Sequence, residues 1–253
     1  MNYLKPFVKK FHGGQKAFAV RASMNTDSES LAEALKLSHA DGMLLLFGGA
    51  SFMPEEMICR LTGMFHVLAE ILVKLKTTVM DGGTNSGVMA LMGKSLHQKG
   101  RQAPHIGVLP AKAEVEPGGP LAEEILEPHH SHFVLVDNDR WGSEVEIMND
   151  LAVSISKNSP SLALLVNGGA IALKDIESCI KRGHELIIVK GSGRLADEIA
   201  EAMLYPEKEA RETVKAIVQQ GKLILYDLFE PSERLTEILK HHLGEKIHNE
   251  SGN

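Results

Sequence analysis

The sequence has few aromatic residues, few cysteines and no long apolar run, and each shortage excludes a class of protein. Aromatic residues make up 5% of the 253 residues, too few for the stacking platforms that hold single-stranded nucleic acid. Cys59 and Cys179 lie in helix-like apolar stretches, which indicates reduced thiols. No apolar run approaches the roughly 20 residues that cross a bilayer, and the N-terminus lacks the features of a secretory signal. We therefore expect a cytoplasmic protein with no membrane contact.

Excess positive charge is also absent. The chain has 33 acidic and 27 basic side chains, for a formal net charge of −6, which argues against binding to polymeric nucleic acid. Hydrophobic residues at 43% and charged residues at 24% are typical of a globular protein. We expect one domain over residues 1–253, with an N-terminal extension at 1–16 and a frayed tail at 244–253. The sequence leaves homo-oligomerisation open.

Short apolar runs alternate with longer segments of helical periodicity. The predicted strands are Ala17–Ala22, Met43–Phe47, Thr77–Met80, Ile106–Leu109, Phe133–Val136, Leu162–Val166, Leu186–Val189 and Leu223–Tyr226. The predicted helices are Ser30–His39, one that begins at Pro54, Ser86–Lys99, Ser143–Ser156, Leu173–Arg182, Leu195–Met203, Pro206–Gln220 and Pro231–Leu243. Continuously apolar strands are typical of a sheet buried on both faces. The pattern predicts a Rossmann-like α/β fold with a mainly parallel sheet.

Glycine pairs follow four of the predicted strands, and each leads into a predicted helix. The loops contain Gly48, Gly49 and Ala50; then Asp81, Gly82, Gly83, Thr84, Asn85 and Gly87; then Gly168 and Gly169; then Gly191, Ser192, Gly193 and Arg194. In a parallel sheet such loops meet at the carboxyl edge, where helix N-termini offer free amides to an anion. One glycine pair can simply permit a tight turn. Four aligned pairs favour a site for a phosphate-bearing ligand, and we expect the residues named above to contact it.

Two named phosphate-binding motifs fit poorly. The segment from Gly87 to Ser95 has five residues between its glycines where a P-loop has four, and it falls inside a predicted helix. The segment from Gly191 to Ala196 matches the dinucleotide fingerprint, but the nearest acidic residue at the end of the following strand, Asp227, lies well beyond the usual spacing of about 20 residues. A nicotinamide-dependent dehydrogenase is therefore disfavoured.

Charged residues in these loops suggest separate roles. Arg194 falls in the first turn of a helix, where a cation is unfavourable unless an anion binds nearby. The alternative is a surface ion pair with Asp197 or Glu198. A carboxylate would repel phosphate, so we expect Asp81 to accept hydrogen bonds from ribose hydroxyls or a base amino group.

The histidines before the fifth predicted strand form a second polar cluster. His130 and His132 share one face if that strand starts early, which would make them a metal pair. Spacing specifies no third ligand. We therefore predict no metal site. We expect these histidines to form a polar start to the strand, with one of them reaching the ligand crevice at the carboxyl edge of the sheet.

Taken in order, residues 44–50, 81–89, 130–137 and 191–197 resemble the cytosolic SLOG domain (LSDAT type) of melastatin-type TRP channels, in a free-standing prokaryotic form. The resemblance runs from about Ala17 to Met203. It implies glycine loops that hold a nucleotide derivative such as ADP-ribose, with the domain acting as a ligand sensor and requiring no cofactor. The superfamily also includes LOG phosphoribohydrolases and DprA-type DNA-binding proteins. The acidic net charge and scarce aromatics disfavour the latter.

The LOG branch suggests an enzymatic alternative. Its catalytic loop has the form Pro-Gly-Gly-x-Gly-Thr-x-x-Glu, whereas this chain has NGGAIALKD over residues 167–175. Asp175 stands where the glutamate would be, while the proline, third glycine and threonine are missing. Cleavage of an N-glycosidic bond needs a carboxylate that activates water, and Glu144 in the segment Trp141-Gly142-Ser143-Glu144 is a second candidate. A nucleotide N-glycosidase with Asp175 or Glu144 as the catalytic residue is the alternative to a binding protein.

Overall fold

One nine-stranded sheet organises the part of the chain that the structure describes. The structure is a computed structural model and describes residues 3–37, 39–49, 53–114 and 125–244. The strands are β1 (Phe7–Lys10), β2 (Lys16–Ala22), β3 (Met43–Gly48), β4 (Thr78–Asp81), β5 (His105–Pro110), β6 (His132–Val136), β7 (Ser161–Val166), β8 (Glu185–Lys190) and β9 (Lys222–Asp227). They lie in the order β1-β2-β6-β5-β4-β3-β7-β8-β9. All neighbours are parallel except β1 and β2.

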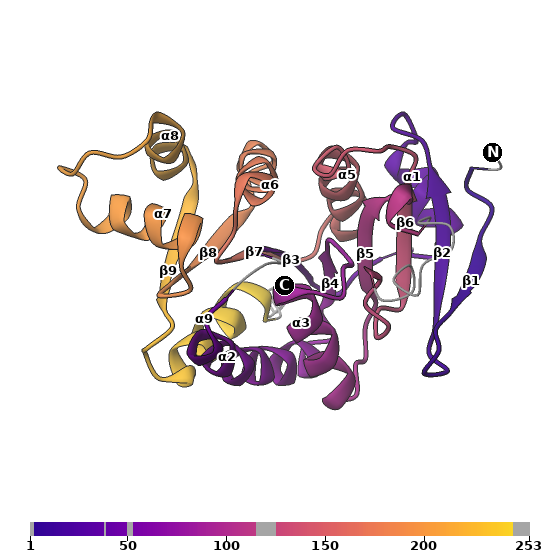
Figure 1. Cartoon of the computed structure of the whole chain (residues 1–253), viewed down its shortest axis with the longest axis horizontal. Helices are drawn as coiled ribbons and strands as arrows, with labels where there is room; N and C mark the ends of the chain where they lie inside the picture. Colours follow the sequence, from indigo (N-terminus) through magenta and orange to yellow (C-terminus); the bar gives the residue numbers. More distant parts are fainter. Residues whose placement is uncertain (1–2, 38, 50–52, 115–124, 245–253) are drawn as a thin grey trace, which may run out of the picture.

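Helices cover both faces of this sheet (Figure 1). They are α1 (Ser28–Ala34), α2 (Glu55–Lys74), α3 (Gly87–Gln98), α5 (Val145–Ser156), α6 (Ala170–Lys181), α7 (Arg194–Leu204), α8 (Glu212–Gln220) and α9 (Ser232–Leu243), with a short 3-10 helix η1 (Ala111–Glu114). Helices α2, α3 and α9 pack on one face, and α1, α5, α6, α7 and α8 pack on the other. No helix in the described ranges is long and apolar enough to span a membrane.

The strand β3 shows why the sequence predicts this arrangement. Leu44 and Leu46 belong to the core under α2, whereas Met43, Leu45 and Phe47 belong to the core on the opposite face. All five side chains are buried. The continuous apolar run is therefore that of a central parallel strand, and the predicted Rossmann-like α/β fold is confirmed.

The eight predicted strands are all present, but the sequence analysis missed β1. This strand lies in the predicted N-terminal extension and pairs antiparallel with β2 at the edge of the sheet. Its four residues, FVKK, alternate between half-buried and exposed. An edge strand of this kind has no continuous apolar run to mark it. Of the predicted frayed tail, only Gly244 falls within the described residues.

Three predicted helix boundaries were wrong by three residues or more. Helix α1 ends at Ala34, before the predicted His39, because Lys36 adopts a left-handed φ of 58° and Leu37 N donates to Ala32 O. Helix α8 begins at Glu212, after the predicted Pro206, since the intervening residues are mostly charged and offer little apolar surface to bury. Helix α6 begins three residues early, at Ala170.

The direction of the strand-to-helix connections reverses in the middle of the sheet. The chain leaves β3 and β4 for α2 and α3 on one face, and leaves β7 and β8 for α6 and α7 on the other. Because β3 and β7 are neighbours, their loops diverge and open a crevice at the carboxyl edge. The four glycine loops follow the contiguous strands β4, β3, β7 and β8.

Gly107 permits the close approach of the β4 loop to β5. A Cβ atom on Gly107 would lie 2.7 Å from the Cα of Gly83 and 2.8 Å from the ring of Phe133. We expect Gly107→Ala to destabilise the fold by about 1–3 kcal/mol through overpacking. Gly63→Ala is the matched control, because Gly63 lies in α2 with open space around its Cβ position, and alanine there should stabilise by up to about 1 kcal/mol. Urea unfolding of both variants checks this; equal effects would contradict it.

Candidate functional site

A cavity of about 350 Å³ lies at the reversal point between β3 and β7. Three of the glycine loops contribute Gly48, Gly49, Gly82, Thr84 and Gly169 to its lining, and α7 contributes Arg194. Its apolar wall includes Met89, Met148, Trp141 and Ile171. Glu144 and Asp175 complete it. The cavity therefore joins a cation, two carboxyl groups and glycine backbone from widely separated parts of the chain.

The other predicted contact residues do not line this cavity. They are Asp81, Gly83, Asn85, Gly87, Gly168, Gly191, Ser192 and Gly193. Gly87 starts α3, so the P-loop-like segment is helical, as expected. Gly168 lines a neighbouring hollow that shares Gly169 and Arg194. Ala50 lies outside the described residues.

The β8 loop is folded around its own acidic residue. Asp197 accepts hydrogen bonds from Gly191 N at 2.6 Å and Gly193 N at 3.1 Å, and both glycines have positive φ. The Ser192 hydroxyl is buried and donates to Val189 O at 2.6 Å. Gly191, Ser192 and Gly193 therefore shape the loop. Of the four predicted contact residues in it, Arg194 is the one that lines the cavity.

Arg194 has no counter-ion within the described part of the chain. Both partners that a surface ion pair would need are engaged elsewhere, because Asp197 binds the loop amides and Glu198 pairs with Arg211. The Arg194 guanidinium lies over Gly169, where a Cβ would sit 2.6 Å from Nη2. Arg194 also has a left-handed φ of 51°, a strained conformation for this residue. The alternative of a surface ion pair is thus wrong.

Helix α6 directs its N-terminus at the same place. Gly169 is its N-cap and forms no side-chain capping hydrogen bond, and no acidic side chain occupies the first turn. Gly169, Ala170, Ile171 and Ala172 all line the cavity. The first amides of a helix lack internal partners and carry the positive end of the dipole. Together with Arg194 they form a positively polarised corner that could accept an anion, called the anion-binding corner below.

The two carboxyl groups lie within the same cavity. Asp175 is 9% exposed and Glu144 is 6% exposed. Burial, followed by the charge of Glu144, raises the pKa of Asp175 to about 8. Burial also raises the pKa of Glu144, although Gly142 N donates to its Oε2 at 2.9 Å. Asp175 forms no hydrogen bond or ion pair with another described residue, so at neutral pH it presents an unpartnered carboxylic acid.

Asn167 braces two of the loops, a role the sequence analysis missed. Its backbone N–H donates to Ser192 Oγ at 2.7 Å, and its Nδ2 donates to Ser192 O at 2.8 Å. Its φ of 60° is left-handed, a conformation that asparagine tolerates better than most residues. An asparagine directly before a glycine pair was the available signal. It fixes the β7 loop to the β8 loop and so places Arg194 over Gly169.

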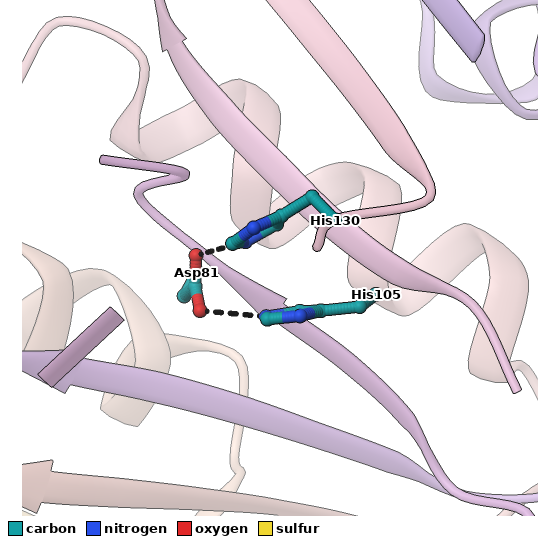
Figure 2. A group of neighbouring side chains, drawn as sticks. All are labelled: Asp81, His105 and His130. Carbon is teal, nitrogen blue, oxygen red and sulfur yellow. Dashed lines mark hydrogen bonds and ion pairs between the residues drawn. The ribbon is translucent and has the colours of Figure 1, made fainter. Parts of the chain in front are cut away.

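Asp81 does not face the cavity, contrary to the expected contact with ribose or base. Its carboxylate is fully buried and binds two histidines, with Oδ1 2.9 Å from His130 Nε2 and Oδ2 2.9 Å from His105 Nε2 (Figure 2). Gly83 N donates to Oδ1 at 2.7 Å. Asp81 therefore holds the β4 loop from beneath while Gly82 and Thr84 line the cavity.

The alternative in which His130 and His132 form a metal pair does not occur, because β6 starts only at His132. The His132 ring bonds Ser131 Oγ and stacks on Phe18. The buried His130 ring stacks on His105, with ring centroids 3.6 Å apart, and its Nδ1 lies 2.9 Å from Glu127 Oε2. Neither histidine reaches the cavity. His105 and Glu127 were missed because only the folded sheet brings them beside Asp81.

The electrostatics of this cluster favour one protonated histidine. Burial opposes charge on His130, but the carboxylates of Asp81 and Glu127 outweigh burial and raise the pKa of His130 to about 9. Burial and the charge of His130 lower the pKa of His105 to about 4, despite Asp81. Burial works against ionisation of Asp81, yet the two histidines lower its pKa. Thus His130 donates from both ring nitrogens, and neutral His105 donates from Nε2.

Comparison with known proteins identifies the family. Residues 42–236, more than half of the chain, match the family model described as "SLOG in TRPM, prokaryote". This chain belongs to that family. The match begins later and ends later than the resemblance seen in the sequence, because it starts at β3 and includes β9.

Similar proteins in animals are much longer. The chain is 25% identical to mouse transient receptor potential cation channel subfamily M member 2 over 233 residues, covering 86% of this chain and 14% of the channel. For the rat channel the identity is 26% with the same coverage. For the member-like 2 protein of Nematostella vectensis it is 26%, covering 74% of this chain and 15% of that protein. The SLOG chain thus corresponds to a small part of each channel.

Among solved structures, the X-ray structure of TM1055, a structural genomics target, has a TM-score of 0.52 with 17% identity. The match covers 79% of this chain and 99% of TM1055. At this identity the likeness supports the fold alone.

The raised pKa of Asp175 makes fold stability depend on pH. The folded state holds this proton up to about pH 8, whereas an ordinary aspartate loses it near pH 3.8. Since the folded state binds more protons over this interval, the stabilisation is fully present below it and is lost as pH rises through it. We expect the free energy of unfolding to fall with pH more steeply in the wild type than in Asp175→Asn.

Urea unfolding over a pH series measures this difference. Glu33→Gln, on the exposed surface of α1, is the control and should keep the wild-type slope. Parallel curves for wild type and Asp175→Asn would show that Asp175 titrates normally.

Proposed function

We propose that this SLOG protein binds a nucleotide-like ligand, with a ribose and a phosphate or diphosphate, in the cavity between β3 and β7, and that it acts as a ligand sensor. An ADP-ribose-like molecule fits this description. The observation that carries the proposal is Arg194, a cation with no counter-ion among the described residues, which lies over the uncapped N-terminus of α6. Membership of the SLOG family supports a nucleotide-related role.

The anion-binding corner supplies the affinity for phosphate. Phosphate oxygens accept from the first amides of α6 and from the Arg194 guanidinium, and such charge-assisted bonds are the stronger kind. The net charge of the chain is −6, so attraction must come from these local groups rather than from a general positive field.

The remaining lining suits the uncharged part of a nucleotide. Trp141 and Ile171 are 40% and 43% exposed and line the cavity, which gives an apolar surface for a base or a sugar face. Protonated Asp175 can both donate and accept, and Glu144 accepts. Ribose hydroxyls, which also donate and accept, are natural partners for this pair.

Calorimetric titration with AMP, ADP-ribose, NAD and cyclic nucleotides tests the proposal. We expect Arg194→Ala to weaken binding by about 10- to 100-fold, the range expected for hydrogen bonds to a charged group. Arg194→Lys keeps the charge and should bind better than Arg194→Ala. The exposed Arg234 on α9 provides the control, and Arg234→Ala should bind like the wild type.

Two results would refute this function. One is the absence of binding tighter than millimolar for every ligand tested. The other is equal affinity in the wild type and Arg194→Ala, which would remove the anion-binding corner from the site.

The carboxyl pair favours a second candidate, a nucleotide N-glycosidase of the phosphoribohydrolase type. Two carboxyl groups in one cavity, both with a raised pKa, are a pair from which acid and base roles can be drawn. In this reaction Glu144 would accept a proton from the attacking water, and Asp175 would donate a proton to the departing base. The altered loop over residues 167–175 argues for binding without turnover.

Chromatography of released base separates the candidates. If the chain is only a binding protein, incubation with nucleoside monophosphates or NAD should release no base above the buffer control. Base release that disappears in both Asp175→Asn and Glu144→Gln, with ligand binding retained, would establish the enzyme instead.

A further inference from the structure

Three residues of metal-binding types converge away from the cavity. Asp81 at the end of β4, His105 at the start of β5 and His130 just before β6 each offer one donor atom, and these atoms all lie within 4.8 Å of one another. All three side chains are fully buried. Figure 2 shows the two imidazole rings one above the other, both directed at the Asp81 carboxylate. We propose that Asp81, His105 and His130 form a structural Zn²⁺ site.

The donor set suits zinc among the common metal ions. Imidazole nitrogen and carboxylate oxygen are both established zinc ligands, whereas calcium and magnesium require oxygen donors. The Asp81 carboxylate can chelate the ion through both oxygens, since each already faces one histidine. Because these two oxygens are closer together than two ideal tetrahedral ligands, the expected geometry is a distorted tetrahedron. With no ligand side chain exposed, no position is open to substrate. The site is therefore of the closed, structural type.

A small movement of the donors admits the ion. Each facing nitrogen and oxygen pair is 2.9 Å apart. Two ligand atoms on a tetrahedral zinc ion are about 3.4 Å apart when both bonds are about 2.1 Å. Separating each pair by about half an ångström is within the range that buried side chains reach by small changes in torsion angles.

Outer contacts orient two of the ligands. His130 Nδ1 donates to Glu127 Oε2 at 2.9 Å, the carboxylate–histidine arrangement found behind zinc ligands. Gly83 N donates to Asp81 Oδ1. Glu127 is itself fixed, because its N–H donates to Gly83 O at 3.0 Å and its carboxylate packs against Gly93, where a Cβ would lie 2.2 Å away.

The proton balance is simple. When zinc binds, His130 releases its Nε2 proton to solvent and keeps the Nδ1 proton that Glu127 accepts. Neutral His105 moves its proton from Nε2 to Nδ1. The described residues offer Nδ1 of His105 no hydrogen-bond partner, so we infer that His130 is the stronger of the two histidine ligands.

Bound zinc would fasten three parts of the chain. The ligands come from β4, β5 and the segment before β6, and Glu127 reaches the β4 loop, whose Gly82 and Thr84 line the cavity. This role does not depend on which ligand occupies the cavity.

Metal analysis of the wild-type chain is the first test. The protein is stripped with a chelator, reloaded with Zn²⁺, dialysed and analysed by mass spectrometry. We expect one zinc ion per chain and a higher melting temperature than in the stripped protein. Reloading with Co²⁺ should give a visible absorption spectrum with nitrogen and oxygen ligation. A chain that retains no zinc and gives no cobalt spectrum overturns the proposal and leaves a hydrogen-bonded cluster.

Variants then locate the ion. His130→Ala and Asp81→Asn should abolish stoichiometric zinc, His105→Ala should weaken binding less than His130→Ala, and Glu127→Gln should weaken it by about 10- to 100-fold. His132→Ala is the matched control, because it lies two residues from His130 and outside the cluster. Zinc binding that survives both His130→Ala and Asp81→Asn would place the ion elsewhere. If these variants fail to fold, a wild type that takes up neither zinc nor cobalt still overturns the proposal.

Discussion

Between β3 and β7 the connections leave the sheet on opposite faces, so neither α2 nor α6 closes over the carboxyl edge at that point. The strands themselves are buried on both faces, so they cannot shift to fill the opening between their diverging loops. The amino-acid residues of the loops are what can vary at this position. Glycines keep the backbone of the β3, β4 and β7 loops close to the cavity, and the helix that follows β7 presents its N-terminus to it. The anion-binding corner is thus a consequence of topology before it is a consequence of any charged side chain.

Arg194 adds charge to this corner because the two acidic residues that follow it in α7, Asp197 and Glu198, bind other groups. Asp197 is three residues further along α7 and would be a natural partner, yet its oxygens accept from the amides of Gly191 and Gly193. Glu198 is held by Arg211. Asn167 fixes the β7 and β8 loops together through Ser192, so the guanidinium stays over Gly169. A cation that has no partner in the described ranges and a strained backbone conformation is the kind of local conflict that marks functional sites.

The sequence was sufficient for the elements that depend on local pattern. Continuous apolar runs such as Leu162–Val166 predicted buried parallel strands, and glycine pairs after them predicted loops at one edge. It was insufficient where the outcome depends on contacts between distant residues. Asp81 could be placed in a loop, but its partner His105 is 24 residues away and His130 is 49 residues away. Likewise the pairing of Glu198 with Arg211, which removes Glu198 as a partner for Arg194, depends on how the segment before α8 folds back on α7. The strand β1 escaped prediction because half of its residues face solvent.

Polar residues that are adjacent in the sequence can belong to different sites, one to the cavity and the other to the buried histidine cluster. Asp81 and Gly82 are adjacent, yet the first points beneath the loop and the second lines the cavity. Had the Asp81 carboxylate faced the cavity, it would have joined Glu144 and Asp175 and opposed any phosphate. By binding His105 and His130 instead, it removes one negative charge from the site and anchors the loop that borders it. The proposed anion site is thus compatible with an acidic chain, because one of the carboxylates near it binds histidines behind the cavity wall rather than facing the cavity.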